Sequence, residues 1–291
     1  MQRYSEVTGD EIGTTMTRLP EHDRRLMLSF EGRTVPDSVG TTLENHDVSG
    51  VTLFRPHNYE TPEQLKALND QLQELSSGDL PMLIAIDQEG GQLHAFGSPA
   101  TMWAGNMALG AVDDVDLTRR VGVAIATELR AVGINVNYAP NADLATNPMN
   151  PATGARSFGD DPELVARHVE AIVAGMQSVG VAATMKHFPG KGDSKIDSHH
   201  GLPLIDHDMD RLESVEFLPF RAAIDAGVKL AMTGHFALPA LTGSDDLPCT
   251  LAEESNTGLL REEMGFEGAM ITDALDMGSL EQGAYQIVDM I

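Results

Sequence analysis

Short apolar runs alternate along the chain with segments in which hydrophobic residues recur every three or four positions. The runs are four or five residues long, which is typical of buried strands. Seven of them occur, at residues 26–30, 51–54, 82–86, 134–138, 181–185, 228–232 and 269–272. Because strands that alternate with helices pair in parallel, the pattern predicts an α/β fold with a parallel sheet.

Capping residues mark the starts of two helices. Thr61 precedes Pro62 and is followed three positions later by Gln64, which predicts an N-cap, a proline in the first turn and a capping box. Asp161 and Pro162 open a second helix in the same way. The positions that follow keep to one face of each helix: Leu65, Leu68, Leu72 and Leu75 in the first, and Leu164, Val165, His168, Ile172 and Met176 in the second.

Side chains able to do acid, base or nucleophilic chemistry follow several of the strands. They are Asp87, Asp143, Lys186 with His187, His235 and Asp273. In a (β/α)8 barrel the active site forms at the C-terminal ends of the strands, whereas a doubly wound sheet concentrates function at one switch point. The recurrence therefore predicts an α/β fold of the TIM-type (β/α)8 barrel class.

The length of the chain suits one such barrel. Its 291 residues, 42% of them hydrophobic, can hold one large α/β domain, so residues 1–291 are predicted to form a single domain. An eighth strand is not visible, because the segment after residues 269–272 reads as a helix up to Ile291. We therefore expect the last strand and helix to be missing, through C-terminal truncation or an unusual closure of the barrel.

The charge balance excludes some partners. Acidic residues outnumber basic ones by 44 to 19, a formal net charge of −25, which argues against binding nucleic acid or an anionic membrane through a basic surface. The acidic residues are spread through helical segments, as on proteins from a high-salt cytoplasm; an ordinary acidic enzyme is the alternative.

The sequence shows neither the pattern of a membrane span nor that of a signal peptide. No apolar run approaches the roughly 20 residues of a membrane span, and residues 1–40 lack the order of a signal peptide. A cytoplasmic protein without membrane association is expected. Cys249 is the single cysteine and has no motif that suggests catalysis.

Four motifs carry a resemblance to a known family. In chain order they are Asp-Gln-Glu-Gly-Gly at 87–91, Arg-Ser-Phe-Gly at 156–159, Lys-His-Phe-Pro-Gly-Lys-Gly at 186–192 with Asp-Ser-His at 197–199, and Ile-Thr-Asp at 271–273. Together they resemble the family 3 glycoside hydrolases, specifically the single-domain β-N-acetylhexosaminidase branch, from about Leu26 to the end of the chain. The resemblance implies a retaining, exo-acting β-N-acetylglucosaminidase that acts on a small carbohydrate and needs no metal or cofactor.

Asp273 ends a predicted strand at the expected rim of the barrel. A carboxylate there can attack an anomeric carbon and form a glycosyl-enzyme, the first half of a retaining double displacement. From spacing alone, an Asp that caps the following helix is at least as good an interpretation. The resemblance places Asp273 at the family's nucleophile position.

Asp197 and His199 match the branch's acid/base dyad. A histidine titrates near neutrality, and an Asp bonded to one ring nitrogen fixes the tautomer and supports the protonated form. A metal site or a solvated loop is the alternative, with His200 as an adjacent candidate, but no Cys cluster or His-Glu-x-x-His spacing supports zinc. The resemblance implies that His199 is the general acid/base and that Asp197 orients it.

The resemblance also implies a set of sugar-binding residues: Asp87, Arg156, Lys186 and His187. Asp87 can accept hydrogen bonds from two sugar hydroxyls, while Arg156 and Lys186 can donate to hydroxyl or N-acetyl oxygens. For Arg156, an ion pair with Asp160 or Asp161 is the alternative.

Three positions depart from the family's pattern. Gln92 and Ala95 stand where basic residues are frequent, which affects the contacts on that rim. Lys191 stands where a His is usual, a change that could alter leaving-group recognition or loop closure without removing the dyad.

Several further residues keep two interpretations. Asn141 and Asp143 fit either a strand-end site or a turn. His235 fits either a core role or substrate contact. Trp103, with Met102, fits either the floor of a sugar subsite or simple packing.

Three other functions stay open beside hydrolysis of a β-N-acetylglucosaminide. A His acid/base leaves less negative charge near the water site than Glu would, so phosphate could act as acceptor in a β-glycoside phosphorylase. A β-glucosidase and a non-catalytic sugar-binding barrel are the others. The natural glycan and the oligomeric state are not indicated by the sequence.

Overall fold

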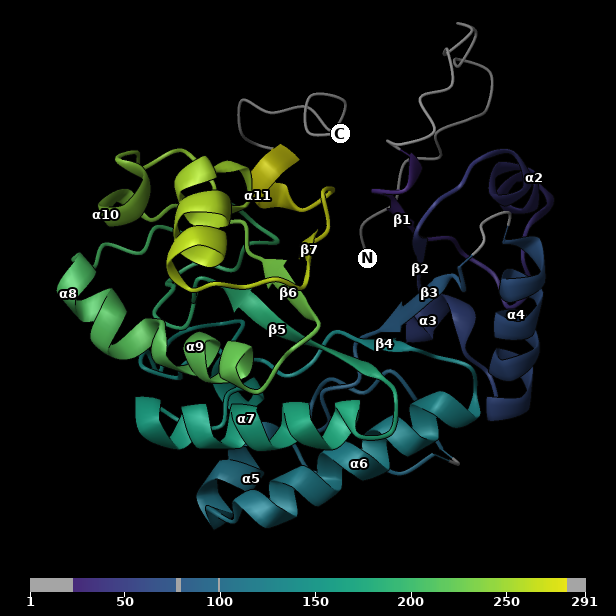
Figure 1. The fold of residues 1–291 in the computed structure, drawn as a ribbon, viewed down its shortest axis with the longest axis horizontal. Helices are drawn as coiled ribbons and strands as arrows, with labels where there is room; N and C mark the ends of the chain where they lie inside the picture. The colour runs from purple at the N-terminus through teal and green to yellow at the C-terminus, as the bar shows by residue number, and fades with distance from the viewer. Residues whose placement is uncertain (1–22, 77–79, 99, 282–291) are drawn as a thin grey trace, which may run out of the picture.

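The computed structural model describes residues 23–76, 80–98 and 100–281, and its centre is a sheet of seven parallel strands (Figure 1). The strands are β1 (Met27–Leu28), β2 (Gly50–Thr52), β3 (Leu83–Ile86), β4 (Val136–Asn137), β5 (Ala182–Phe188), β6 (Leu230–Thr233) and β7 (Ala269–Thr272). Each of the seven predicted runs overlaps one of them, so the predicted strands are confirmed, although β2, β5 and β6 extend beyond the runs.

The strands pair in chain order from β1 to β7, each parallel to its neighbours. They form a curled half-barrel, which is the TIM-type (β/α)8 architecture without its last element, as the sequence predicted. Within the described residues, neither β1 nor β7 pairs with a further strand. The sequence of the predicted last helix beyond residue 281, and residues 1–22 of the segment searched for a signal peptide, lie outside the described residues.

Helices follow the strands and cover the outside of the sheet (Figure 1). The α-helices are α2 (Asp37–Asn45), α3 (Arg55–Asn58), α4 (Pro62–Leu75), α5 (Asn106–Val112), α6 (Val115–Ala131), α7 (Pro162–Gln177), α8 (Met209–Arg211), α9 (Leu218–Asp225), α10 (Pro239–Thr242) and α11 (Gly278–Glu281). Short 3₁₀ turns are η1 (Gly154–Arg156) and η3 (Cys249–Leu251), and π-helical segments are η2 (Leu212–Glu216) and η4 (Glu254–Glu263). No helix among the described residues is both long enough and apolar enough to cross a bilayer.

The predicted caps are present. Thr61 accepts a hydrogen bond from the Gln64 amide at 3.1 Å, and Asp161 accepts one from the Leu164 amide at 2.8 Å. The capping box is offset by one residue, because the Gln64 side chain accepts from the Glu60 amide instead of the Thr61 amide. These bonds satisfy amides that the first turn of a helix leaves without partners.

Two apolar clusters lie on the two sides of the sheet. The larger one fills the space between the sheet and helices such as α4 and α7, where Leu65, Leu72 and Val169 are fully buried. The smaller one occupies the inside of the half-barrel and contains Tyr138 and Met232. Polar side chains at the strand ends therefore rest on a packed floor instead of an open channel.

Strand β5 is longer than predicted. The apolar run was expected to end at Met185, but β5 continues to Phe188, because Lys186 pairs with Met232 and Phe188 with Thr233 across an irregularity in register. Lys186 and His187 are therefore strand residues.

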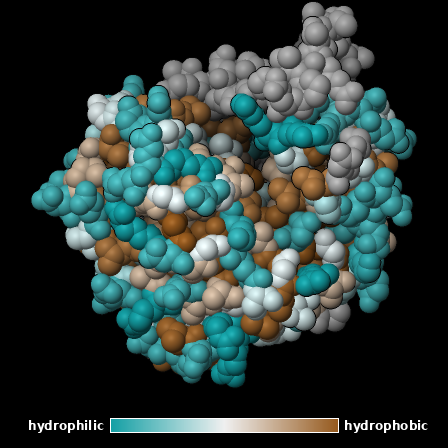
Figure 2. All heavy atoms as spheres, viewed as in Figure 1, coloured by the Kyte–Doolittle hydropathy of each residue, from teal (hydrophilic) through white to brown (hydrophobic). Residues whose placement is uncertain are grey.

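Figure 2 shows hydrophilic side chains over much of the viewed face and hydrophobic ones gathered towards its centre.

Candidate active site

Charged side chains from three strands meet at the C-terminal edge of the sheet. Lys186 Nζ lies 2.5 Å from Asp87 Oδ1, which follows β3, and 2.6 Å from Glu89 Oε1. The Lys186 side chain is 2% exposed. Burial would lower the pKa of Lys186, but the carboxylates of Asp87 and Glu89 raise it above its usual value, so the ammonium stays charged.

Arg156 joins this group from the short turn η1. Its Nε and Nη2 donate to the two oxygens of Glu89 at 2.9 and 2.8 Å, a bidentate pair whose side chains are 15% and 1% exposed. The alternative of an ion pair with Asp160 or Asp161 is wrong, because the guanidinium turns towards the strand ends. Burial would raise the pKa of Glu89, but Lys186 and Arg156 lower it to about 2.

Glu89 is a residue that the sequence reasoning missed. In the sequence, Glu89 appears only as a member of the Asp-Gln-Glu-Gly-Gly motif at 87–91, with no role of its own. The sequence did contain a signal for this role. Glu89 is a second carboxylate two residues after Asp87 at the strand end, and a carboxylate buried there needs a cation as its partner. Glu89 holds both cations of the predicted sugar-binding set.

His187 is bonded to Asp143 on the neighbouring strand end. His187 Nδ1 lies 2.8 Å from Asp143 Oδ2, and Asp143 Oδ1 accepts from the Lys191 amide at 2.9 Å. Asp143 is buried, so its role is at the site, while Asn141 takes the turn role by accepting from the Asp143 amide at 2.8 Å. Burial, reinforced by Lys191, holds the pKa of His187 well below its usual value.

Asp273 follows β7 and faces this cluster. Its Oδ2 lies 3.9 Å from both His187 Nε2 and Lys191 Nζ, and its Oδ1 accepts from the Ala274 amide at 2.9 Å. Burial would raise the pKa of Asp273, but Lys191 and His187 lower it to about 2. The helix-cap interpretation is wrong, because α11 begins only at Gly278. Asp273 is an ionised carboxylate with one oxygen directed at the cluster.

His235 supports the segment after Asp273. It is fully buried, and its Nε2 donates to the Ala274 carbonyl at 2.9 Å. Burial lowers the pKa of His235, so the ring is neutral near pH 7. Of the two interpretations left open, the buried supporting role fits the structure.

Asp197 and His199 lie together on the loop after β5. His199 Nδ1 is 2.7 Å from Asp197 Oδ1, and the His199 side chain is 66% exposed. Burial would raise the pKa of Asp197, but its bonds to the backbone and side chain of His199 lower it. The loop is tied to the segment after β7, because the Ser279 amide donates to the Ser198 carbonyl at 3.0 Å. Asp197 and His199 are therefore hydrogen-bonded to each other at the rim, outside the buried cluster.

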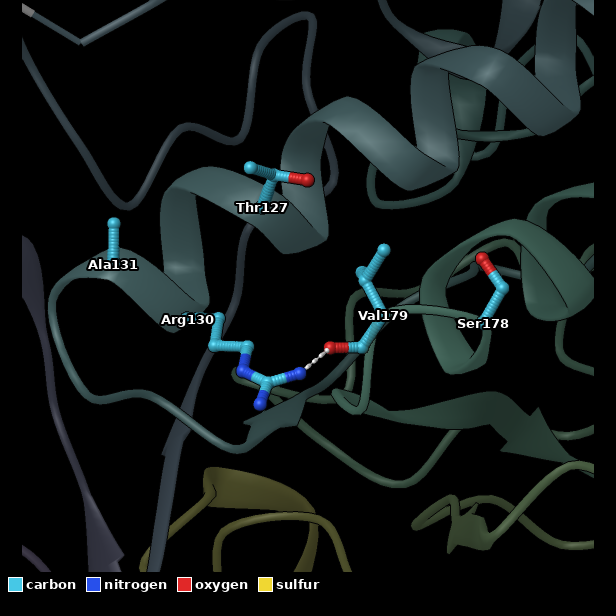
Figure 3. Close-up of a pocket in the computed structure, with 5 residues that line it drawn as sticks. All are labelled: Thr127, Arg130, Ala131, Ser178 and Val179. Carbon is cyan, nitrogen blue, oxygen red and sulfur yellow. Dashed lines mark hydrogen bonds between the residues drawn. The ribbon is translucent and has the colours of Figure 1, made fainter.

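Other surface features lie apart from this cluster. Trp103 donates its indole N–H to Glu128 on α6 at 3.0 Å, which supports packing instead of a subsite floor, and Met102 is exposed. A depression of about 600 Å³ is lined by Thr127, Arg130, Ala131, Ser178 and Val179 (Figure 3). It lies at the C-terminal ends of α6 and α7, and since these helices run back against the strands, it opens at the opposite end of the barrel.

Comparison with known proteins identifies the family. The Glycosyl hydrolase family 3 N terminal domain matches residues 26–287. Beta-hexosaminidase A of Pseudoalteromonas piscicida is 38% identical over 85% of this chain and 44% of its own, and the Beta-N-acetylglucosaminidase/beta-glucosidase of Cellulomonas fimi is 33% identical over 92% of this chain and 48% of its own.

A solved structure agrees with these relatives. The family 3 beta-N-acetylglucosaminidase from Paenibacillus sp. FPU-7 is 42% identical and superimposes with a TM-score of 0.88 over 91% of this chain and 51% of that one. The chain thus spans about half the length of several of the proteins that it matches. The match to the family's N-terminal domain and the similarity to these relatives agree with the charged groups found at the strand ends. This chain belongs to glycosyl hydrolase family 3.

Proposed function

We propose that the protein is a retaining exo-β-N-acetylglucosaminidase, which hydrolyses the bond of a terminal β-linked N-acetylglucosamine. The observation that carries the proposal is the ionised Asp273 carboxylate, which faces the buried side chains of His187 and Lys191 at the strand ends. The choice of N-acetylglucosamine as the sugar rests on the names of the family 3 relatives.

The buried cluster would bind the sugar. Asp87 is 27% exposed and can accept hydrogen bonds from hydroxyls, while Lys186 and Arg156 can donate to oxygens. Because Glu89 already neutralises and orients both cations, little reorganisation is needed when a sugar arrives. Rigid donors and acceptors of this kind would hold the sugar with its anomeric carbon near Asp273.

In the first half-reaction, an Asp273 oxygen would attack C1 and the C1–O bond to the leaving group would break. His199, protonated at the start, would give its proton to the departing oxygen while Asp197 holds the ring. His199 lies on the exposed loop after β5, from which it would reach the departing oxygen of the bound sugar.

In the second half-reaction, neutral His199 would take a proton from water. The water oxygen would attack C1, the C1–Oδ bond would break, and its electron pair would return to Asp273. Two inversions at C1 retain the β configuration. The neighbouring His187 has a pKa held well below its usual value, so it cannot readily supply the proton that His199 gives.

A second candidate keeps the same first step and uses phosphate as the acceptor. His199 as the acid/base places less negative charge near the acceptor than a carboxylate would, which favours an anionic acceptor. β-Glucosidase activity is a further candidate, supported by the name of the Cellulomonas relative. A non-catalytic sugar-binding barrel would bind the same sugars without turnover.

One screen separates these candidates. Nitrophenyl β-N-acetylglucosaminide and β-glucoside would be incubated with the protein, with and without inorganic phosphate, and the products followed by proton NMR. Release of β-N-acetylglucosamine at a rate independent of phosphate supports the proposal. A sugar phosphate formed only with phosphate supports phosphorolysis, preference for the glucoside supports a glucosidase, and saturable binding without turnover supports the non-catalytic barrel.

A further inference from the structure

Lys191 is an unusual buried charge. The chain has five lysines against fourteen arginines, yet Lys186 and Lys191 are both buried at the strand ends. Lys186 has carboxylate oxygens at 2.5 and 2.6 Å. The ion-pair partner of Lys191 within the described residues is Asp273 at 3.9 Å, too far for a direct hydrogen bond. An ammonium buried this way acts on its carboxylate mainly through charge.

The backbone of Lys191 is fixed independently of its side chain. Its amide donates to Asp143 Oδ1 at 2.9 Å, and its carbonyl accepts from Asn150 Nδ2 at 3.1 Å. The Ser194 amide also donates to that carbonyl at 3.1 Å. A substitution at Lys191 should therefore leave the path of the loop intact while it removes the charge near Asp273.

We propose that Lys191 is a positioning residue that stabilises the carboxylate form of Asp273 and thereby speeds its departure from the glycosyl-enzyme. The proposal rests on the proposed function, in which Asp273 is the nucleophile. Asp273 loses its negative charge when it bonds to C1 and regains it when water displaces it. A fixed cation beside Asp273 therefore restrains the first half-reaction and assists the second.

The surrounding charges are consistent with an ionised pair. Burial lowers the pKa of Lys191, opposed by the attraction of Asp273 and Asp143, while Arg156 and Lys186 repel the ammonium. Lys191 is also the largest source of positive charge acting on the Asp273 carboxylate, whose pKa is lowered to about 2. Conversion of Asp273 to an ester should remove that attraction and lower the pKa of Lys191.

The test separates the two half-reactions with dinitrophenyl β-N-acetylglucosaminide, whose leaving group needs little proton transfer. The burst of dinitrophenolate reports formation of the glycosyl-enzyme, and the steady state reports its breakdown. In Lys191→Met we expect the steady-state rate to fall about 3- to 30-fold. A neighbouring opposite charge contributes about 1–3 pKa units, each worth about tenfold, and we take about half of that effect to be expressed in the transition state. The burst rate should be unchanged or faster, and KM should fall with kcat.

Two variants serve as controls. Lys195→Met removes the same charge from an exposed position of the same loop and should leave both phases unchanged. Lys191→Arg keeps the charge and should retain most of the steady-state rate. Equal loss of burst and steady-state rates in Lys191→Met would show a structural role and overturn the proposal.

A measurement on the unaltered protein covers the case in which the variant does not fold. A 5-fluoro glycosyl fluoride would trap the glycosyl-enzyme, and ¹⁵N-lysine NMR would follow the five ammonium groups before and after trapping. The Lys191 pKa should fall on trapping, with Lys195 unaffected. An adduct mapped to Asp273 with an unchanged Lys191 titration overturns this inference alone, whereas an adduct on another residue overturns the nucleophile assignment of the proposed function.

Discussion

Two regions of the site differ in how firmly their side chains are held. One is the buried cluster at the strand ends, which contains Lys186 and Glu89, and the other is the exposed loop after β5 that carries Asp197 and His199, called the dyad loop below. Lys186 and Glu89 are 2% and 1% exposed and each contacts two opposite charges. His199, by contrast, is 66% exposed and is bonded through its ring to Asp197. The first region is ordered before substrate arrives, whereas the second keeps contact with solvent.

This difference fits the two tasks that we propose. Groups that hold a sugar gain from being fixed in advance, because no free energy is then spent on ordering them at the moment of reaction. A proton donor that must serve leaving groups and water in turn needs access to both. We expect changes in the cluster to affect folding and binding, and changes in the loop to affect the proton-dependent steps.

The largest effect is expected at the junction of the two regions. Asp273→Ala should lower turnover by about 10⁶-fold, as is typical when a covalent nucleophile is lost. Asp276→Ala, at an exposed position three residues further along the chain, should be near wild type. Mechanism-based fluoro-sugar labelling followed by peptide mass mapping should place the adduct on Asp273; an adduct on Asp276 or Asp87 would contradict the assignment.

The dyad loop is tested by His199→Ala. Cleavage of a natural disaccharide should fall about 10²- to 10⁴-fold, because the leaving group needs a proton. Glycosylation by a dinitrophenyl substrate should be spared, so that the glycosyl-enzyme accumulates as a burst. The neighbouring His200→Ala is the control. Equal loss on both substrates would assign His199 to binding or loop structure instead.

The buried cluster is tested by Glu89→Gln, which leaves Lys186 and Arg156 without a shared carboxylate. Loss of a partner in a buried ion pair should lower the free energy of unfolding by about 3–5 kcal/mol. Asp70→Asn breaks the exposed pair with Lys66, 2.6 Å apart, and should cost less than about 0.5 kcal/mol. Urea unfolding curves of both variants compare the two regions directly. Equal costs would remove the distinction.

Acid should destabilise the buried region in two stages. His187 and His235 have pKa values lowered by burial, so the unfolded state binds their protons first, and stability should fall as the pH drops below about 6.5. The slope should be about 1.4 kcal/mol per pH unit for each histidine.

The second stage comes from Glu89 and Asp273, whose pKa values of about 2 lie below those of the unfolded chain. Their contribution is present above about pH 4 and should be lost between about pH 4 and 2. Urea unfolding from pH 7.5 downwards measures both stages. His235→Asn should reduce the slope of the first stage by about half, and an unchanged slope would contradict the assignment to these rings.

Salt should change the stability that depends on exposed charges and leave the stability that depends on the buried cluster nearly unchanged. With a formal net charge of −25, screening of repulsion should raise the thermal midpoint as KCl increases, by about 2–4 °C per kcal/mol gained. The cost of Glu89→Gln should stay nearly constant in the same series, while that of Asp70→Asn should vanish. A flat or falling midpoint would remove the expectation of a halophilic surface.

Much of the fold follows from local patterns. The seven apolar runs each overlap a strand, and the Thr61 and Asp161 caps start their helices, because strand periodicity and capping depend on nearby residues. The positions of Asp87, Lys186 and Asp273 at strand ends follow from the same reasoning. The pairing of Arg156 with Glu89 does not, since it joins residues 67 positions apart.

The sequence by itself determined the order of elements, the parallel sheet and the type of chemistry at the strand ends, because each depends on residue types and spacings within a few turns of chain. Only the tertiary structure decided which charges pair. Arg156 reached Glu89 instead of the nearby Asp160 or Asp161, Asp143 became the partner of His187, and Lys191 came to lie 3.9 Å from Asp273. Burial selects these partners, since a charge removed from water must find compensation wherever the fold brings it.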